Sequence, residues 1–256
     1  MTHQFYEGDA RDILRQRLEA GDRWDYCLTS PPYFQQIDYE QTGQYGLEEK
    51  LITYLVRQAD LFDLVYQGMG EGGVCWVVIG DTMNNYSPVR SKSQRRRPGE
   101  WSHRRQFQEH FREKEPLMVP HQLAEYCRAG GWHLRKMLIW DKGQTGQPAK
   151  GDAPGECHEY ILMLGKWTQG GRPYFNVSPL KSTVLRHSPV SHPNHPCVFP
   201  QSLAEELLAS IKQETAVILD PYVGTGTTAR AAERLGHRCI GIDLSLDELE
   251  VSSATN

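Results

Sequence analysis

The feature that most constrains the fold of this chain is a glycine turn between an apolar run and a helical segment. The apolar run is AVIL at 216–219, the turn is DPYVGTGTT at 220–228, and a segment typical of a helix covers 227–235. Gly224 and Gly226 let the backbone approach a ligand closely. The turn follows a predicted strand, and open α/β sheets bind their ligands at the carboxyl ends of strands. The pattern therefore predicts an α/β sheet with a ligand site at this turn.

Short apolar runs alternate with longer amphipathic segments along the chain, as expected for the strands and helices of an α/β sheet. The expected strands are residues 3–6, 25–28, 73–79, 133–140, 159–164, 216–219 and 239–242. The expected helices are residues 47–66, 119–128, 202–212 and 227–235. With 256 residues, the chain is long enough to bury a large core in one α/β domain.

Three classes of cofactor could use the glycine turn. An NTPase phosphate loop is excluded because no Lys-Ser/Thr pair follows the second glycine. A nicotinamide dinucleotide fits in part, since Gly224-x-Gly226-x-x-Ala229 approximates its fingerprint and Asp243 could accept hydrogen bonds from ribose hydroxyls. S-Adenosylmethionine needs no phosphate cradle but needs acids for its ribose and its ammonium group, and Asp220 at the strand end suits that ammonium. The turn by itself leaves the last two classes open, together with a purely structural role.

A second motif, TSPPY at 29–33, follows another predicted strand. Pro32 holds Pro31 extended and neither can continue a sheet ladder, so the Ser30 hydroxyl and the Pro31 carbonyl project from a rigid strand end. The exocyclic amine of cytosine or adenine is a poor nucleophile because its lone pair is delocalised into the ring. Two fixed acceptors can hold both amine hydrogens and aim the lone pair at a methyl donor. Tyr33 offers a stacking face for a base swung out of the duplex.

Together the two motifs resemble those of the S-adenosylmethionine-dependent DNA amino-methyltransferases, in the circularly permuted beta class. The segment at 30–33 matches the family's catalytic motif (D/N/S)-P-P-(Y/F), and the turn matches its cofactor loop D-P-F-x-G-S-G-T-T, with Tyr222 and Thr225 as departures. The catalytic motif precedes the loop by 187 positions, counted from Tyr33 to Asp220, which is the permuted order. The resemblance implies a doubly wound, seven-stranded, Rossmann-like methyltransferase sheet, circularly permuted.

The resemblance also implies the residues of the site. Its catalytic residues are Ser30, Pro31, Pro32 and Tyr33. Its S-adenosylmethionine site consists of Asp9, Phe199, Asp220, Tyr222, Gly224, Thr225, Gly226, Thr227 and Asp243. Within the family, Ser-Pro-Pro-Tyr occurs mostly in cytosine-N4 enzymes and Asp-Pro-Pro-Tyr in adenine-N6 enzymes. The expected activity is therefore methylation of cytosine N4 in DNA, with adenine N6 as the alternative.

Three other functions explain the sequence less completely. A carbon-5 cytosine methyltransferase needs a Pro-Cys nucleophile, but Pro196-Cys197 has no accompanying Glu-Asn-Val, so we interpret Cys197 as a buried small residue. A nicotinamide-dependent oxidoreductase explains the glycine turn and Asp243 but gives the motif at 29–33 no task. A non-catalytic DNA-binding module explains the basic residues described next but not the cofactor site.

The charge of the chain is unevenly distributed. The net charge is −4, yet RSKSQRRRPGEWSHRR at 90–105 carries +6 and residues 201–256 carry −5. We predict a basic loop at 86–115 that binds phosphates and a small target-recognition region at about 166–194 that reads bases, because lysines and arginines neutralise the DNA backbone. The predicted DNA-binding residues are Arg95, Arg96, Arg97, Arg104, Arg105, Arg172, Lys181 and Arg186.

The remaining sequence features predict a protein with DNA as its partner and no metal. Six scattered cysteines without a CxxC pair indicate reduced thiols, and the spacing of His187, His192, His195 and Cys197 matches no zinc pattern, so histidine hydrogen bonds are expected instead. No apolar run is long enough for a membrane span, and the first residues lack the pattern of a secretion signal. We expect a location in the cytoplasm of a bacterial or phage-infected cell, with a cognate restriction endonuclease as a candidate partner. No feature specifies an oligomeric state.

Overall fold

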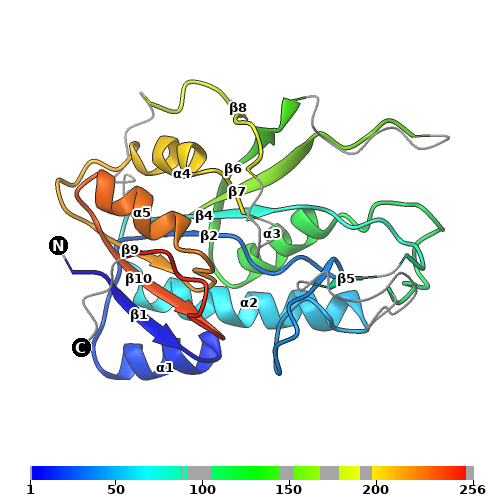
Figure 1. Cartoon of the computed structure of the whole chain (residues 1–256), viewed down its shortest axis with the longest axis horizontal. Coiled ribbons are helices and arrows are strands. Elements are labelled where there is room, and N and C mark those ends of the chain that lie inside the picture. The colour runs from blue at the N-terminus through cyan, green and yellow to red at the C-terminus, as the bar shows by residue number, and fades with distance from the viewer. Residues whose placement is uncertain are drawn as a thin grey trace.

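An eight-stranded sheet in the order β1-β10-β9-β2-β4-β7-β6-β8 forms the centre of the molecule (Figure 1). The computed structural model describes residues 2–87, 89–91, 105–143, 153–167, 179–190 and 198–251. The strands of the sheet are β1 (Gln4–Glu7), β2 (Tyr26–Thr29), β4 (Val74–Ile79), β6 (His133–Asp141), β7 (His158–Gly165), β8 (Val184–Arg186), β9 (Val217–Asp220) and β10 (Arg238–Asp243). A separate parallel pair consists of β3 (Ile37–Asp38) and β5 (Arg90–Ser91).

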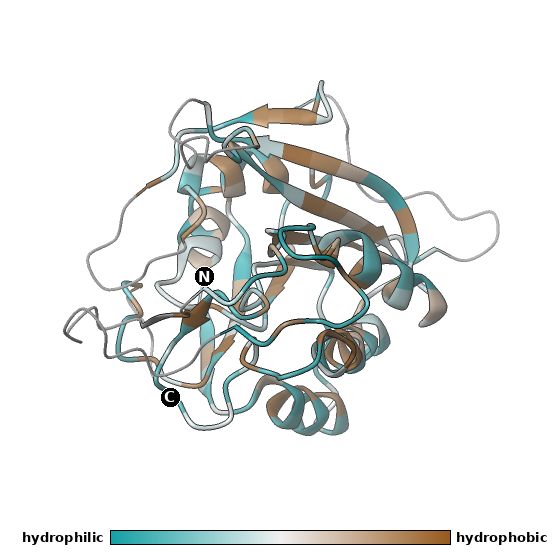
Figure 2. Ribbon diagram, turned by 90° about the vertical axis from the view of Figure 1, so that its right-hand side faces the viewer, coloured by the Kyte–Doolittle hydropathy of each residue, from teal (hydrophilic) through white to brown (hydrophobic). Residues whose placement is uncertain are grey.

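Helices cover both faces of the sheet, so the predicted doubly wound arrangement is confirmed. Helices α1 (Ala10–Glu19), α2 (Leu51–Gly68) and α3 (Val119–Ala129) pack on one face, and α4 (Gln201–Leu208) and α5 (Thr227–Arg234) on the other (Figure 1). Each side has its own apolar cluster, because successive side chains of a strand point to opposite faces. The central strands are largely apolar, whereas the helices carry both polar and apolar residues (Figure 2).

Strand β4 shows why the centre of the sheet reads as a continuous apolar run. All six of its residues are buried. Val74, Trp76 and Val78 face α4 and α5, while Cys75 and Val77 belong to the cluster with α1, α2 and α3. A strand covered on both faces has no polar alternation, and this pattern is typical of parallel sheets in α/β proteins.

The strand directions place the predicted motifs at one edge. β1, β10, β9, β2 and β4 are parallel, β7 is antiparallel to β4 and to β6, and β8 is parallel to β6. β2 lies directly beside β9 although the two are far apart in sequence. The carboxyl ends of β2 and β9 therefore meet, and the order of the two strands along the chain is that of the permuted class.

The observed elements differ in part from the expected set. The sheet has eight strands where seven were expected, because Val184–Arg186 adds a short parallel edge strand to β6. Only Leu185 of this strand is buried, so three residues give too little pattern to be recognised. Helix α1 was missed as well, although Asp9 precedes it as an N-cap and its buried residues are Ala10 and Leu14.

Within the described residues, no helix is long and apolar enough to cross a membrane.

Candidate active site

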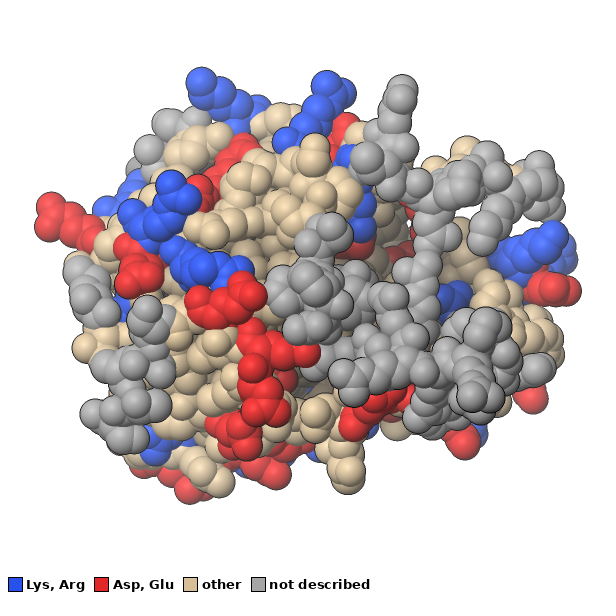
Figure 3. Space-filling model, in the orientation of Figure 1, with Lys and Arg blue, Asp and Glu red and all other residues tan. Residues whose placement is uncertain are grey.

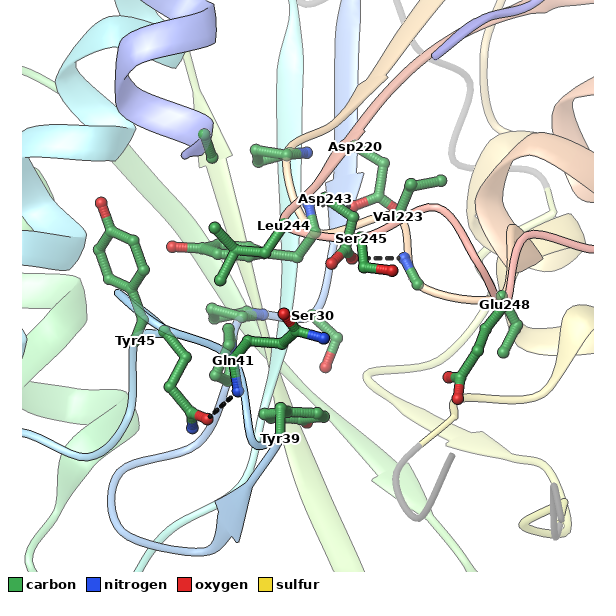
Figure 4. A pocket seen from close by; sticks show the side chains of 18 of the residues that line it. Ser30, Tyr39, Gln41, Tyr45, Asp220, Val223, Asp243, Leu244, Ser245 and Glu248 are labelled. Carbon is green, nitrogen blue, oxygen red and sulfur yellow. Dashed lines mark hydrogen bonds between the residues drawn. The ribbon is translucent and has the colours of Figure 1, made fainter. Parts of the chain in front are cut away.

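A cavity opens where the carboxyl ends of β1, β2, β9 and β10 meet. Figure 4 shows Asp220, Asp243 and Ser245 on one side of this cavity, with Ser30 and Gln41 approaching from the other. The residues that line it are Gly8, Ala10, Ser30, Pro31, Pro32, Tyr33, Ile37, Tyr39, Gln41, Gln44, Tyr45, Val198, Phe199, Asp220, Pro221, Tyr222, Val223, Gly224, Thr225, Thr227, Asp243, Leu244, Ser245 and Glu248. The structure thus brings both predicted motifs to one cavity.

Asp243 is fixed at the end of β10 by the glycine turn. The Gly224 amide donates to Asp243 Oδ2 at 2.8 Å, and the Gly8 amide donates to the Asp243 carbonyl at 2.8 Å. Gly224 has a φ of +48° and Gly226 one of +88°, a region that favours glycine. The carboxylate is held in place at the position where a ribose acceptor was predicted.

Asp220, at the end of β9, is a buried carboxyl that joins the two motifs. The residue is only 2% exposed, and Thr29 Oγ1 of β2 donates to its Oδ1 at 2.7 Å. The Tyr222 amide also donates to Oδ1, at 3.1 Å. Burial raises the pKa of Asp220 from 3.8 to about 6, partly offset by hydrogen bonds from Thr228 and Thr29. A cation bound nearby would favour the ionised form of this carboxyl.

The catalytic motif leaves β2 in a tightly held turn. The buried Tyr54 hydroxyl donates to the Pro32 carbonyl at 3.0 Å, and the Gln36 amide donates to the Tyr33 carbonyl at 3.3 Å. Gly46 packs against the turn so closely that a Cβ there would lie 2.9 Å from the Tyr33 carbonyl oxygen. These contacts hold the turn that carries the two predicted acceptors, the Ser30 hydroxyl and the Pro31 carbonyl.

The charge of the cavity distinguishes between the cofactors left open by the sequence. Among the described residues that line it are the carboxyl groups of Asp220, Asp243 and Glu248 but no Lys, Arg or His. Asp and Glu side chains also gather on the side of the molecule where α5 and β10 lie (Figure 3). Such a site suits the sulfonium and ammonium groups of S-adenosylmethionine and repels the pyrophosphate of a dinucleotide. The residues present therefore fit the predicted cofactor.

Most of the predicted cofactor residues line the cavity, with two exceptions. Phe199, which is 8% exposed, lines the cavity. Tyr222, Thr225 and Thr227 line it as well. Asp9 is not among the lining residues, and its carboxylate accepts hydrogen bonds from the Arg11 and Asp12 backbone amides as the N-cap of α1. Gly226 is the N-cap of α5, and a Cβ there would collide with the segment that follows β10. Cofactor contacts stay a prediction for all of these residues, including those that line the cavity.

Sequence reasoning missed one wall of the cavity and part of its support. The wall is formed by the segment after the catalytic motif, namely Ile37, Tyr39, Gln41, Gln44 and Tyr45. The support comes from Glu159 on β7, which accepts a hydrogen bond from the Tyr33 hydroxyl, and from Lys142 after β6, which is bonded to Glu159. The segment HEYIL at 158–162 resembles a further segment of the family, but no local pattern shows that it reaches the motif. Glu159 becomes a neighbour of Tyr33 only through the pairing of distant strands.

The predicted DNA-binding residues fall partly outside the described residues. Arg95, Arg96, Arg97, Arg104 and Arg172 lie outside them. Arg105 is described, and its Nε donates to the Gln35 carbonyl at 3.0 Å, close to the catalytic turn.

Two further predicted cations flank the edge strand β8. Lys181 precedes the strand and is exposed, and Arg186 ends it. Arg186 is 84% exposed, and its Nε lies 3.0 Å from Asp141 Oδ2 at the end of β6. β7 is antiparallel to both β4 and β6, so β6 and β8 run in the same direction as β2 and β4. Arg186 and Asp141 therefore lie at the same edge of the sheet as the cavity.

His187 behaves as predicted for a hydrogen-bonding histidine. Its Nδ1 lies 2.8 Å from Ser202 Oγ and its Nε2 lies 2.7 Å from Glu206 Oε2, so it ties the end of β8 to α4. His192, His195 and Cys197 lie outside the described residues. Within the described part of the chain, no group of three or more His, Cys, Asp or Glu side chains could hold a metal ion.

Comparisons with known proteins agree with this site. The family model described as DNA methylase matches residues 24–254. The type II methyltransferase M.SmaI of Serratia marcescens is 30% identical over 253 residues, which cover 93% of this chain and 85% of the relative.

Solved structures share the fold. The PvuII DNA methyltransferase, described as cytosine-N4-specific, has a TM-score of 0.68 at 15% identity and covers all of this chain and 89% of its own. A protein from Thermus thermophilus, described as a DNA modification methylase and solved with S-adenosyl-L-methionine, has a TM-score of 0.63 at 24% identity, covering 95% of this chain and 90% of its own.

Proposed function

The chain belongs to the DNA methylase family of S-adenosylmethionine-dependent amino-methyltransferases, and on this basis we propose that it methylates the exocyclic N4 of cytosine in DNA. The observation that carries the proposal is the position of Ser30, which lies at the cavity that Asp220 and Asp243 also line. A base amine held at Ser30 is therefore beside a site suited to a cationic methyl donor. The cofactor is S-adenosylmethionine, which supplies a methyl group on a sulfonium.

The chain's own residues orient the amine. The Ser30 hydroxyl and the Pro31 carbonyl accept its two hydrogens, and this leaves the nitrogen lone pair directed at the cavity. Tyr33 stacks on the base that has left the duplex. The Thr29–Asp220 hydrogen bond fixes the distance between the strand carrying these acceptors and the strand carrying the cofactor acids.

Two observations favour cytosine N4 over adenine N6. The first residue of the catalytic motif is Ser30, which the family uses mostly in cytosine-N4 enzymes. The PvuII enzyme, whose fold this chain shares, is described as cytosine-N4-specific. Adenine N6 is the alternative, because both amines undergo the same chemistry.

We further propose that DNA lies across the carboxyl edge of the sheet. One methyltransferase domain, residues 1–256, would hold it through the basic loop at 86–115 and the region at about 166–194. Arg95, Arg96, Arg97, Arg104, Arg105, Arg172, Lys181 and Arg186 are the proposed contacts. The partners would be DNA and a cognate restriction endonuclease, and the site of action the bacterial cytoplasm.

Mass spectrometry of the product nucleosides tests the proposal. The protein is incubated with labelled S-adenosylmethionine and DNA of mixed sequence, and the DNA is then digested to nucleosides. N4-methylcytosine is the expected product, and the Ser30→Ala variant, as the matched control, should bind cofactor normally but transfer little label. N6-methyladenine would replace the cytosine proposal by its alternative. Absence of any transfer by wild-type protein that binds S-adenosylmethionine would refute the function itself.

A further inference from the structure

The catalytic turn is hydrogen-bonded to an ion pair on the other half of the sheet. The Tyr33 hydroxyl donates to Glu159 Oε2 at 2.6 Å, and Lys142 Nζ binds Glu159 Oε1. Ser30 Oγ lies 3.4 Å from the Tyr33 hydroxyl. The side chains of Glu159 and Lys142 are 13% and 22% exposed. A continuous path of polar groups therefore runs from Ser30 through Tyr33 and Glu159 to Lys142.

The antiparallel direction of β7 is what brings Glu159 to the turn. Tyr160 pairs with Ile79 at the end of β4, so Glu159 lies one position further on, next to Gly80. A Cβ at Gly80 would lie 2.9 Å from Tyr33 Cε2 and 3.6 Å from Glu159 Cγ. The missing side chain at Gly80 leaves the space in which the Tyr33 ring approaches Glu159.

The path has a fixed direction of hydrogen bonding. The carboxylate of Glu159, held by the Lys142 ammonium, can only accept a hydrogen bond. The single proton of the Tyr33 hydroxyl is therefore directed to Glu159. In the contact between Tyr33 and Ser30, the Tyr33 oxygen is then the acceptor and the Ser30 hydroxyl is the donor. When Ser30 donates to Tyr33, both lone pairs of its oxygen are left for other donors. A hydroxyl that is to hold an amine hydrogen must present such a lone pair.

We propose that Glu159 is a positioning residue that makes Ser30 a hydrogen-bond acceptor for the target amine. This inference rests on the proposed function, since it assigns a role within the same site. Lys142 is the residue that holds the Glu159 carboxylate in the rotamer that reaches Tyr33. The 3.4 Å separation of Ser30 and Tyr33 suits a contact that shortens when substrate binds, as catalytic hydrogen bonds commonly do.

The Glu159→Gln variant reverses this direction. The Lys142 ammonium attracts the amide carbonyl of the glutamine, so its NH₂ group is turned towards the Tyr33 hydroxyl. Tyr33 must then accept instead of donate, and its own proton is directed towards Ser30. We expect the single-turnover rate of methyl transfer at saturating DNA and cofactor to fall about tenfold to a hundredfold, as for the loss of one preorganised interaction. The dissociation constant of S-adenosylmethionine and the thermal midpoint should stay close to wild type.

A second substitution should restore the rate. In Lys142→Met/Glu159→Gln the ammonium is gone, so the glutamine can turn its carbonyl to Tyr33 and the original direction returns. We expect this double variant to be faster than Glu159→Gln alone, although it has lost both charged groups. A double variant as slow as, or slower than, Glu159→Gln would overturn the proposal, because restoring the direction of the path would then restore no activity. Relief of an unpaired, partly buried ammonium would instead appear as a low thermal midpoint of Glu159→Gln that recovers in the double variant.

Tyr33→Phe gives an independent check in the middle of the path. In this background Glu159 has no hydroxyl to orient, so adding Glu159→Gln should not slow transfer further. If Glu159→Gln slowed methyl transfer equally in the wild-type protein and in the Tyr33→Phe variant, Glu159 would not act through Tyr33.

The outcomes separate this inference from the proposed function. If wild-type protein methylates DNA and Glu159→Gln keeps its full rate, only the positioning role fails. If wild-type protein binds S-adenosylmethionine and transfers no methyl group to DNA, the proposed function fails first.

Discussion

The buried carboxyl of Asp220 is expected to make cofactor affinity depend on pH between pH 5 and pH 7. Its pKa is raised to about 6 by burial, and it lines the cavity proposed for the cationic cofactor. Binding of a cation favours the ionised form. At pH 7 about nine-tenths of the carboxyls are ionised, and at pH 5 about one in eleven. We therefore expect S-adenosylmethionine to bind about tenfold more weakly at pH 5 than at pH 7, a difference of about 1.4 kcal/mol.

The Asp220→Asn variant is the matched control, because it keeps the size and the acceptor of Asp220 but cannot ionise. Its dissociation constant should be higher than that of wild type at pH 7 and should not change between pH 5 and pH 7. Isothermal titration calorimetry without DNA measures both proteins. A wild-type dissociation constant that is flat over this range, or an Asn variant that keeps the tenfold change, would refute the reasoning.

The stability of the protein should depend on pH in the opposite direction to its cofactor affinity, so the two measurements distinguish an effect on binding from an effect on folding. Because the pKa of Asp220 rises from 3.8 in the unfolded chain to about 6 in the folded protein, folding takes up a proton between these values. The free energy of unfolding without cofactor therefore falls as pH rises through this window and stays low above it. The side chain of the Asp220→Asn variant cannot ionise, so the variant avoids the fall in the free energy of unfolding that ionisation of the buried carboxyl causes. At pH 7.5 its thermal midpoint should therefore equal or exceed that of wild type. Weaker binding by a protein of equal or greater stability cannot be ascribed to misfolding.

Three further changes have expected outcomes that follow from single contacts. Gly80→Ala places a Cβ 2.9 Å from the Tyr33 ring, so single-turnover methyl transfer should slow by about tenfold or more while calorimetry shows unchanged cofactor binding; an unchanged rate would contradict the tight fit. Tyr54→Phe leaves the Pro32 carbonyl without its buried donor and should lower the free energy of unfolding, measured by chemical denaturation, by about 1–3 kcal/mol. An unchanged free energy of unfolding would contradict this role of Tyr54. His187→Ala should weaken DNA binding in a fluorescence-anisotropy titration several-fold without affecting cofactor affinity, since β8 is then no longer tied to α4; equal loss of both affinities would count against this role.

The sequence predicted those parts of the fold whose signal is local. Central strands such as β4 were recognisable because every residue is buried, and the glycine turn at 224–226 because positive φ angles favour glycine. Both motifs were placed at strand ends, and the structure puts them in one cavity. Helix α1 also had a local signal, since Asp9 caps it, and it was overlooked.

The parts that were not predicted depend on strand pairing. The segment at 158–162 resembles a segment of the family, but its sequence does not show that Glu159 binds Tyr33, because the contact exists only through the register of β4 with β7. The same holds for Thr29 and Asp220, which are joined through the pairing of β2 with β9. A contact between distant strands needs the sheet order, and residue type alone does not supply it.

The pairing of β1 with β10 has a consequence for protein synthesis. Gln4 pairs with Ile240, and the Gly8 amide binds the Asp243 carbonyl at the cavity. A ribosome adding about 5–20 residues per second makes the catalytic motif roughly ten to forty seconds before this last strand. During this interval the growing chain therefore carries Ser30, the proposed acceptor for the target amine, without a complete cofactor site. Methyl transfer can begin only after the last strand of the sheet has left the ribosome and closed onto the first.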